Sequence, residues 1–283
     1  MTIVPRILLL AALLAPAAAT AAEREVARVV AFGGACAGCE LSGRKLAGAR
    51  FIGANFAGAA LVGSDLRGAR FIGSNFARAD LSRSDLSDTA ITGANFAQAN
   101  LSGARLRGAE LRGANLSGAN LTGADGAGVE AEGGNFTRAL LVGAQFAGAR
   151  LLAAMLTGVD AQNANFKGAG MQGAMLTSGR FDGASFQGAD LQQAVITGAS
   201  FVRTDFRDAD LTGAVIAGAD LSRARGLSQG QLDEACGDSR TRVPERLTVR
   251  ACSGIRLFVR RTAPPMPPAP PAPPVPRHLV MAE

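Results

Sequence analysis

Residues 54–58 of this chain read Ala-Asn-Phe-Ala-Gly, and similar units follow at 79–83 (Ala-Asp-Leu-Ser-Arg), 114–118 (Ala-Asn-Leu-Ser-Gly) and 209–213 (Ala-Asp-Leu-Thr-Gly). Every fifth residue from Leu41 to Leu221 is Leu, Phe, Ile or Met, with small residues at three of these positions. Neither the helical period of 3.6 nor the strand period of 2 stays in register with a period of five. Each unit can bury its apolar side only against like neighbours, so the sequence predicts a solenoid.

These units resemble the pentapeptide-repeat family, whose signature is Ala-(Asp/Asn)-Leu-x-x in tandem. The resemblance implies an all-β solenoid, a right-handed quadrilateral β-helix with four units per coil. The central Leu or Phe and the small residue two places before it would point inward. Gly recurs two places after the centre, where a corner needs φ > 0. We expect this β-helix over residues 39–225, as about nine coils and a rod of about 44 Å.

Four units per coil place residues 20 apart in one stacked column. One inward column begins with Phe56, Phe76 and Phe96, whereas the Phe residues of the second half occupy another column, at Phe146, Phe166, Phe186 and Phe206. Between the two halves, the consecutive centres Gly126 and Ala131 lack large side chains. This coil predicts either a bend with local fraying or an ordinary imperfection that the fold tolerates.

One outward column carries Asn at Asn55, Asn75, Asn95, Asn115 and Asn135. We interpret it as structural, because stacked amides can hydrogen-bond from coil to coil. The same column then becomes apolar, at Met155, Met175, Val195 and Val215. These four residues, beside Thr157, Thr177 and Thr197, form what we call the apolar stripe. It is interpreted either as a contact site for a partner or a homodimer, or as tolerated surface apolar residues.

Residues 1–21 have the pattern of a secretory signal peptide. Arg6 precedes an apolar run from Ile7 to Ala15, and Ala19-Thr20-Ala21 resembles a cleavage site. The alternative is an uncleaved N-terminal anchor, although the run is too short to span a bilayer. We therefore expect a periplasmic or secreted protein with no transmembrane segment in the mature chain, and an N-terminal cap segment over 22–38.

An exported chain meets an oxidising compartment, so its four cysteines are candidates for disulfides. Cys36 and Cys39 form a C-x-x-C motif, for which structural pairing or capping is favoured over redox chemistry. Cys236 and Cys252 are the candidate disulfide after the repeats, closing a loop of about 15 residues worth about 3 kcal/mol. A rod between the two pairs excludes a zinc site made of all four.

The segment after the repeats predicts a C-terminal cap over 226–262. Ser228 and Gln231 fit the capping box of a short helix, with Gly237 as its stop. The cap is rich in arginine, at Arg240, Arg242, Arg246, Arg250, Arg256, Arg260 and Arg261. Residues 263–283 form a Pro-rich tail, either a polyproline spacer or a docking motif.

The distribution of charged residues distinguishes between the possible functions of the chain. The best understood members of the resembled family imitate DNA with acidic columns and bind gyrase, but residues 39–225 here hold 16 acidic and 18 basic residues. Clustered Arg with stacking aromatics is missing too, so nucleic acid is not an expected partner. The only histidine is His278, in the tail. Without a catalytic set, we expect no enzyme activity, cofactor or metal.

The sequence therefore predicts a non-enzymatic periplasmic scaffold or binding protein that presents its solenoid faces to a protein or an anionic envelope component. The alternatives are a structural spacer, tethered at the envelope by the basic cap and Pro-rich tail, and a DNA-mimicking gyrase-binding protein. Charge and export disfavour the DNA mimic.

Overall fold

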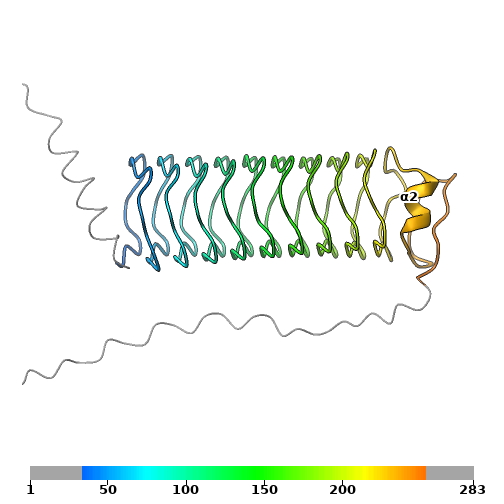
Figure 1. Cartoon of the computed structure of the whole chain (residues 1–283), viewed down its shortest axis with the longest axis horizontal. Helices are drawn as coiled ribbons and strands as arrows, with labels where there is room; N and C mark the ends of the chain where they lie inside the picture. Colours follow the sequence, from blue (N-terminus) through cyan, green and yellow to red (C-terminus); the bar gives the residue numbers. More distant parts are fainter. Residues whose placement is uncertain (1–33, 253–283) are drawn as a thin grey trace, which may run out of the picture. The chain divides into compact units, whose positions relative to one another are not determined.

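The computed structural model describes residues 34–252, which form a rod of stacked coils closed at the C-terminal end by a cap (Figure 1). Four units make one coil. Every fifth residue from Ala35 to Arg225 forms a parallel bridge with the residue four units away, from Ala35 with Asn55 to Asp205 with Arg225. The β-helix thus starts one unit earlier than the expected residue 39, and Cys36 is its first inward centre. The signal peptide, most of the expected N-terminal cap segment and the Pro-rich tail lie outside the described residues.

The corners explain why the unit is five residues long. At almost every corner, the C=O of the centre accepts a hydrogen bond from the N–H three residues later, as Leu46 does from Ala49 (3.1 Å). At Phe51 the hydroxyl of Ser74 stands between the two groups instead, accepting from the N–H of Ala54 (3.2 Å) and donating to the C=O of Phe51 (3.0 Å). Gly48 between Leu46 and Ala49 has φ +69°, as the third position of a type II turn requires. Each unit therefore consists of a short extended stretch on one face of the coil and one turn at the corner. The equivalents of Ala49 are small because little space is left beside the following centre: at Gly134 an added Cβ would lie 3.0 Å from the ring of Phe136 and 3.0 Å from the carbonyl oxygen of Ala131.

The core is a stack of rings and aliphatic side chains along the axis of the rod. Phe56 and Phe76 are stacked with centroids 4.9 Å apart, and Phe76 and Phe96 with centroids 4.8 Å apart. In the second half, Phe166 stacks on Phe186 at 5.1 Å. This spacing is that of neighbouring β-strands, so a single repeat distance serves the backbone bonds and the aromatic contacts.

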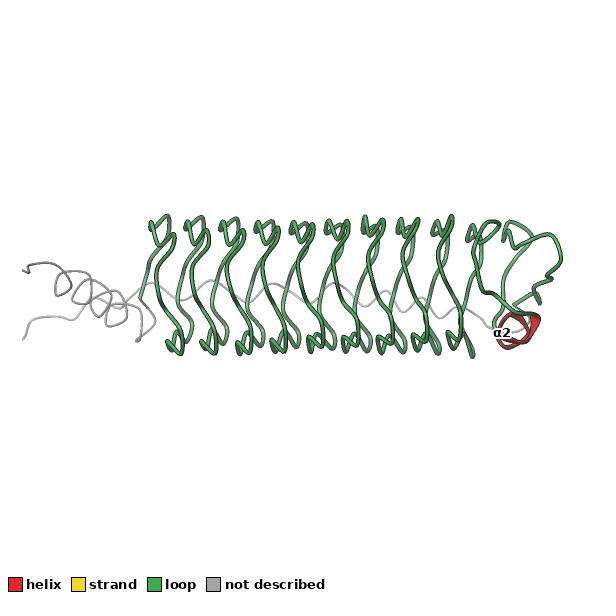
Figure 2. Ribbon diagram, turned by 90° about the horizontal axis from the view of Figure 1, so that it is seen from above, coloured by secondary structure: helices red, strands yellow, loops and turns green. Residues whose placement is uncertain are grey.

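The coil with the small centres continues without interruption. The N–H of Gly126 donates to Gln145 (2.7 Å) and that of Ala131 to Arg150 (2.8 Å). The ring of Phe146 occupies the space beside Gly126, where an added Cβ would lie 2.9 Å from its Cε1. Figures 1 and 2 show the coils stacked along one straight axis through this region. The expected bend is therefore wrong, and the tolerated imperfection is correct.

The cap begins with helix α2, Gln229–Glu234, whose N-cap Ser228 and Gln231 form the expected capping box. Gln231 also donates from Nε2 to the carbonyls of Phe206 (2.9 Å) and Ala209 (2.7 Å), which face the open end of the β-helix. The helix ends at Glu234, three residues before the expected stop at Gly237. The chain becomes extended at Ala235 because Cys236 then bridges to Val215.

Candidate functional site

One face of the rod carries no charged side chain in its two outward columns, and we call it the uncharged face. Its first column is Ala35, Asn55, Asn75, Asn95, Asn115, Asn135, Met155, Met175, Val195 and Val215. Its second column, two residues further along each unit, is Ala37, Ala57, Ala77, Ala97, Ser117, Thr137, Thr157, Thr177, Thr197 and Ala217. The equivalent columns of the other three faces each contain both acidic and basic residues. The face therefore runs the whole length of the β-helix, and charge next to it begins only at the adjoining corner, with Arg78 and Arg138.

The asparagines of this face form a continuous hydrogen-bonded ladder. From Asn75 onward, each Nδ2 donates to the Oδ1 of the residue one coil earlier, from Asn75 to Asn55 (3.1 Å) through Asn135 to Asn115 (3.4 Å). Each Oδ1 also accepts from the backbone N–H two residues later, as Asn135 does from Thr137 (3.0 Å). This is the coil-to-coil bonding that the sequence analysis expected, and it leaves the ladder largely satisfied from within.

The apolar stripe continues the ladder without a break in register. Bridges join Met155 to Met175, Met175 to Val195 and Val195 to Val215. Met175 is 43% exposed, whereas Val215 is only 9% exposed because the cap continues the column above it through Cys236. Val215 is thus part of the contact with the cap, contrary to its expected outward exposure. The surface of the stripe consists of Met155, Met175 and Val195.

Replacing asparagine in this column gives up polar contacts. Within the described residues, no side chain accepts a hydrogen bond from the backbone N–H of Thr157, Thr177 or Thr197, whereas Asn135 still serves Thr137. A net hydrogen bond is worth about 1 kcal/mol. Met and Val give up such bonds in three consecutive coils, and the rod gains exposed apolar surface in exchange. Because these apolar side chains cost the rod hydrogen bonds, they suit a surface that contacts another molecule better than one that only stabilises the fold.

The other faces hold part of their charge in ion pairs. Arg112 lies 2.7 Å from Glu130, and Arg150 contacts the other oxygen of Glu130 at 2.7 Å. Large apolar side chains also occur on these faces, as the stacked pair Ile52 and Ile72 or singly, as Leu152 (49% exposed) between Glu132 and Gln172 in its column. The sequence analysis did not identify the uncharged face as a whole. Comparing both outward columns of every face, coil by coil, would have found it.

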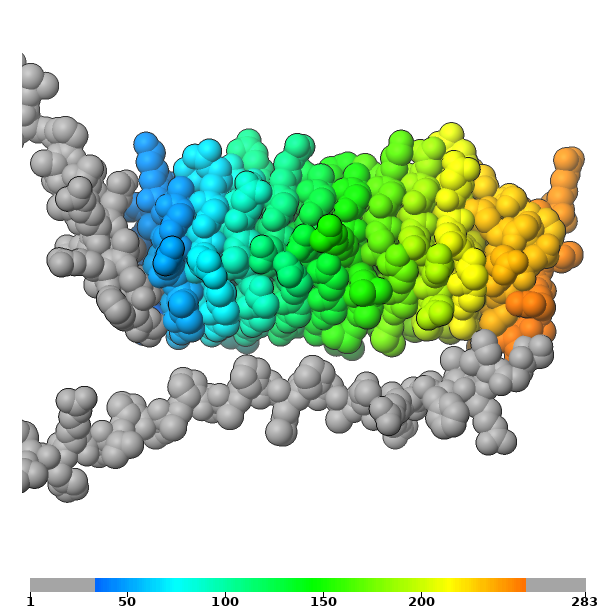
Figure 3. Space-filling model, in the orientation of Figure 1, coloured from blue at the N-terminus to red at the C-terminus, as the bar shows by residue number. Residues whose placement is uncertain are grey.

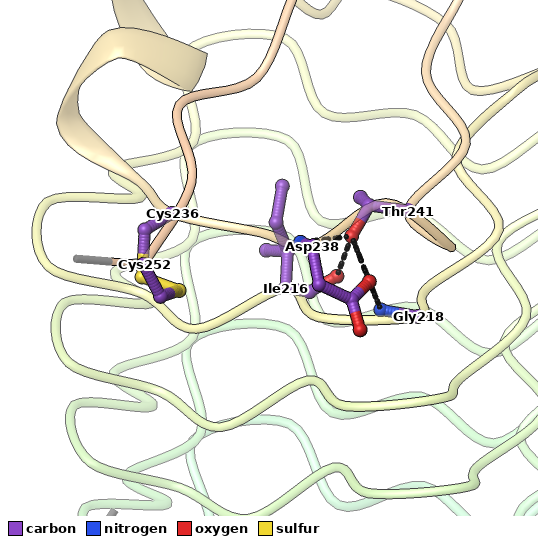
Figure 4. The surroundings of a disulfide bond; sticks show 6 residues. All are labelled: Ile216, Gly218, Cys236, Asp238, Thr241 and Cys252. Carbon is purple, nitrogen blue, oxygen red and sulfur yellow. Dashed lines mark hydrogen bonds between the residues drawn. A yellow bond between two sulfur atoms is a disulfide. The ribbon is translucent and has the colours of Figure 1, made fainter. Parts of the chain in front are cut away.

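Two disulfides close the ends of the β-helix. Cys36 pairs with Cys39 across the first corner, and Cys236 pairs with Cys252 in the cap, with Cα atoms 4.8 Å apart. Figure 4 shows the second disulfide near a hydrogen-bonded loop built on Asp238. Oδ1 of Asp238 accepts from the N–H of Gly218 (2.8 Å), so this loop fastens the cap to the last complete coil.

The charge of Asp238 matters for that attachment. Its desolvation raises the pKa, but hydrogen bonds from Gly218, Arg240 and Thr241 outweigh this and hold the pKa at about 2. Arg240 contacts Oδ2 through Nε (3.1 Å) and Nη2 (3.0 Å). The carboxylate is therefore ionised at every physiological pH, and the loop is a fixed part of the cap.

A recess of about 500 Å³ lies between the last coil and α2, lined by Arg207, Asp208, Asp210, Gln231 and Glu234 among others. Hydrogen bonds from Thr212 hold the pKa of Asp210 below its ordinary value, which suits a structural anion better than a general acid.

Within residues 34–252 no cluster of His, Cys, Asp or Glu has the arrangement of a metal site. In the same residues, no helix has the length and apolarity that a bilayer crossing needs. Figure 3 shows the packed coils as a continuous surface.

Comparison with known families agrees with this geometry. Models of pentapeptide repeats match residues 36–71, 49–88, 91–125, 135–173, 154–193 and 181–225. The chain belongs to the pentapeptide-repeat family, and its fold is the right-handed quadrilateral β-helix. No curated protein matches it.

Similar solved structures include HetL, a pentapeptide repeat protein involved in heterocyst differentiation regulation in the cyanobacterium Nostoc sp. strain PCC 7120. It is 29% identical, the match covers 66% of this chain and 90% of HetL, and the TM-score is 0.37. QnrB1, a plasmid-mediated fluoroquinolone resistance protein, is 21% identical over 71% of this chain and 92% of QnrB1, with a TM-score of 0.41. A pentapeptide repeat protein of the Arabidopsis thaliana thylakoid lumen is 27% identical over 44% of this chain and 69% of its own, with a TM-score of 0.22.

Proposed function

We propose that this protein is a non-enzymatic binding scaffold of the periplasm or the extracellular space, and that it holds a partner protein on its uncharged face. The observation that carries the proposal is the absence of charge along two columns of this face, beside three faces that each carry both acidic and basic residues. Depletion of charge and enrichment of Met are features of the buried centres of protein interfaces. Export rests on the sequence pattern of residues 1–21.

A binding experiment can test the face directly. The mature chain is used as bait on a periplasmic extract, beside the variants Met175→Lys and Leu152→Lys, which each place one charge at an exposed apolar position. We expect Met175→Lys to lose the captured partner, because the new charge would be desolvated in the contact. Leu152→Lys, on a charged face, should retain it. Equal capture by both variants would exclude the uncharged face as the binding surface.

Export is tested separately. The chain including residues 1–21 is expressed in a bacterial host, the cells are fractionated, and the N-terminus is determined by mass spectrometry. Cleavage after Ala21 predicts a mature protein that begins at Ala22 in the periplasm or the medium. A full-length chain that stays with the cytosol would contradict the proposed location.

The second candidate is a spacer held at an anionic envelope component through the cap. Its support is that Arg246 and Arg250 make no ion pair within residues 34–252, whereas Arg240 and Arg242 are paired with Asp238 and Asp220. Co-sedimentation with anionic and neutral lipid vesicles tests it. The spacer role predicts binding to anionic vesicles that the double variant Arg246→Gln, Arg250→Gln weakens.

A further inference from the structure

We propose that the partner on the uncharged face is a second copy of this chain, with the two rods lying parallel, side by side. This inference rests on the proposed function, since it names the occupant of the same face. In a two-fold symmetric dimer the same surface contacts itself. The absence of charge in both columns of this face means that no like charges meet in such a contact. Each of the other faces would bring some of its charges close to their own copies.

The relief of the face favours the parallel arrangement. The Asn and Met side chains of the first column are longer than the Ala, Ser and Thr side chains of the second column, so the first column is raised except at Val195, which matches Thr197 in size. A two-fold axis parallel to the rods places the raised column of one copy against the lower column of the other. Met175 then lies opposite Thr177 of the same coil, and Asn75 opposite Ala77. An antiparallel pair would instead set raised column against raised column.

The equal spacing of coils in the two copies also favours the parallel arrangement. Both copies have the same coil spacing of about 4.8 Å, so a match achieved in one coil is repeated in every coil. The stripe also meets the stripe, which buries Met155, Met175 and Val195 against the methyl groups of the threonines. An antiparallel pair in full overlap would place these apolar side chains against the asparagine ladder.

The ladder enters a contact with most of its hydrogen bonds already made. Oδ1 of Asn95 accepts from Nδ2 of Asn115 (3.1 Å) and from the N–H of Ala97 (3.1 Å), and its Nδ2 donates to Asn75 (3.0 Å). Polar groups that keep their hydrogen bonds lose little when water is removed. The second N–H of each amide still needs an acceptor, which a retained water or a hydroxyl of the other copy can supply. The second half of the face supplies the apolar area.

The available area indicates a weak contact. Ten coils at about 4.8 Å and a face about 10 Å wide give on the order of 500 Å² per copy. Two copies bury about 1,000 Å², the minimum for a biological interface and below the usual range of about 1,200–2,000 Å². We therefore expect a weak, reversible dimer with contact along the full length of the rod.

Sedimentation velocity of the mature chain over a range of concentrations tests the dimer. We expect Met175→Lys to weaken association by at least about tenfold, and the matched variant Leu152→Lys to change it less than about twofold. Circular dichroism and thermal unfolding of each variant show whether its fold is retained. A wild-type chain that stays monomeric at every concentration would overturn the proposal. So would equal weakening by the two variants.

The orientation is tested with spin labels on Ser178→Cys and, in a second sample, Gln98→Cys. Both positions are exposed corners beside the face that already have φ near +57°, and the native cysteines are all paired. The parallel dimer predicts the same distance between the two labels at both positions. An antiparallel dimer predicts different distances, since the labels would be offset by about five and about three coils, and this result would refute the parallel arrangement.

The outcomes separate this inference from the proposed function. A monomeric wild type that still captures a protein, with capture lost in Met175→Lys, would reject the second copy and support the proposed binding face. If the wild type is monomeric and Met175→Lys captures the partner as well as the wild type does, the second copy and the proposed binding face are both rejected.

Discussion

At the scale of single residues, the corners store strain. Eleven corner residues that are not glycine have φ between about +53° and +61°, among them Ala153 at +53°. A Cβ in this left-handed region costs about 1–2 kcal/mol. The rod tolerates these residues because backbone hydrogen bonds to the next coil fix ten of the eleven corners. Ala153 N–H, for example, donates to Gln172 C=O (2.8 Å).

Ala153→Gly should therefore stabilise the protein, by about 1 kcal/mol after the greater entropy of Gly in the unfolded chain is subtracted. Its neighbour Ala154 is fully buried, so Ala154→Gly removes a packed methyl group and should destabilise by about 1 kcal/mol. Chemical denaturation of both variants measures the difference. Destabilisation of equal size in both would contradict the strain argument.

The inward and outward positions differ most clearly at Phe166 and Lys167. Phe166 is 1% exposed and stacks on Phe186, whereas Lys167 is exposed. Phe166→Ala should cost about 3–5 kcal/mol, and Lys167→Ala less than about 0.5 kcal/mol. Thermal melts of the two variants test this, and similar melting temperatures would mean that the assignment of the columns is wrong.

At the scale of elements, the repeat was predictable and the cap was only partly so. A strict period of five predicts a solenoid, and the resemblance to the pentapeptide-repeat family supplies the four units per coil. The columns, the asparagine ladder and the Phe stacks follow from these two together. The cap breaks that period, because Val215 bridges to Cys236 and Asp220 to Arg242, partners that lie beyond the regular spacing of one coil. Spacing alone could not show that α2 is inserted here, or that Val215 is thereby covered.

The Cys236–Cys252 pair remains a prediction for the exported protein. Peptide mapping without reductant should recover a linked peptide containing both residues from protein purified out of the periplasm. The physical reason is that their Cα atoms lie 4.8 Å apart, within reach of a disulfide in an oxidising compartment. Free thiols at both positions would show that the cap is held without this bond.

The attachment of the cap should depend on acid pH through Asp238. Its pKa in the folded protein, about 2, lies below the ordinary 3.8. Its charge therefore stabilises the cap fully above about pH 4, and this contribution is lost as the pH falls through about 2. The amide signal of Gly218 in two-dimensional NMR should titrate with a midpoint near 2. Asp238→Asn keeps an acceptor for Gly218 and should abolish the titration, whereas a midpoint near 3.8 in the wild type would contradict the cause.

At the scale of the whole molecule, one side of the rod differs from the other three. Ion pairs such as Arg180 with Asp160 (3.4 Å) cover the charged faces; at the surface they contribute little to stability but keep those faces soluble. The uncharged face has no such charged side chains in either of its outward columns. This asymmetry is the feature on which the proposed contact rests.

A double variant that extends the asparagine ladder distinguishes an effect of the apolar stripe on folding from an effect on association. Met175→Asn with Val195→Asn places two amides where Asn95 and Asn115 are already accommodated in the same column. The new amides should accept from the N–H groups of Thr177 and Thr197, so the free energy of unfolding should stay equal or rise. Association through the face should weaken by about 1–2 kcal/mol, because apolar contact area is lost. Denaturation and sedimentation measure the two effects. Unchanged association with an intact fold would show that the stripe is an ordinary surface, and unfolding would show that the column packs inward.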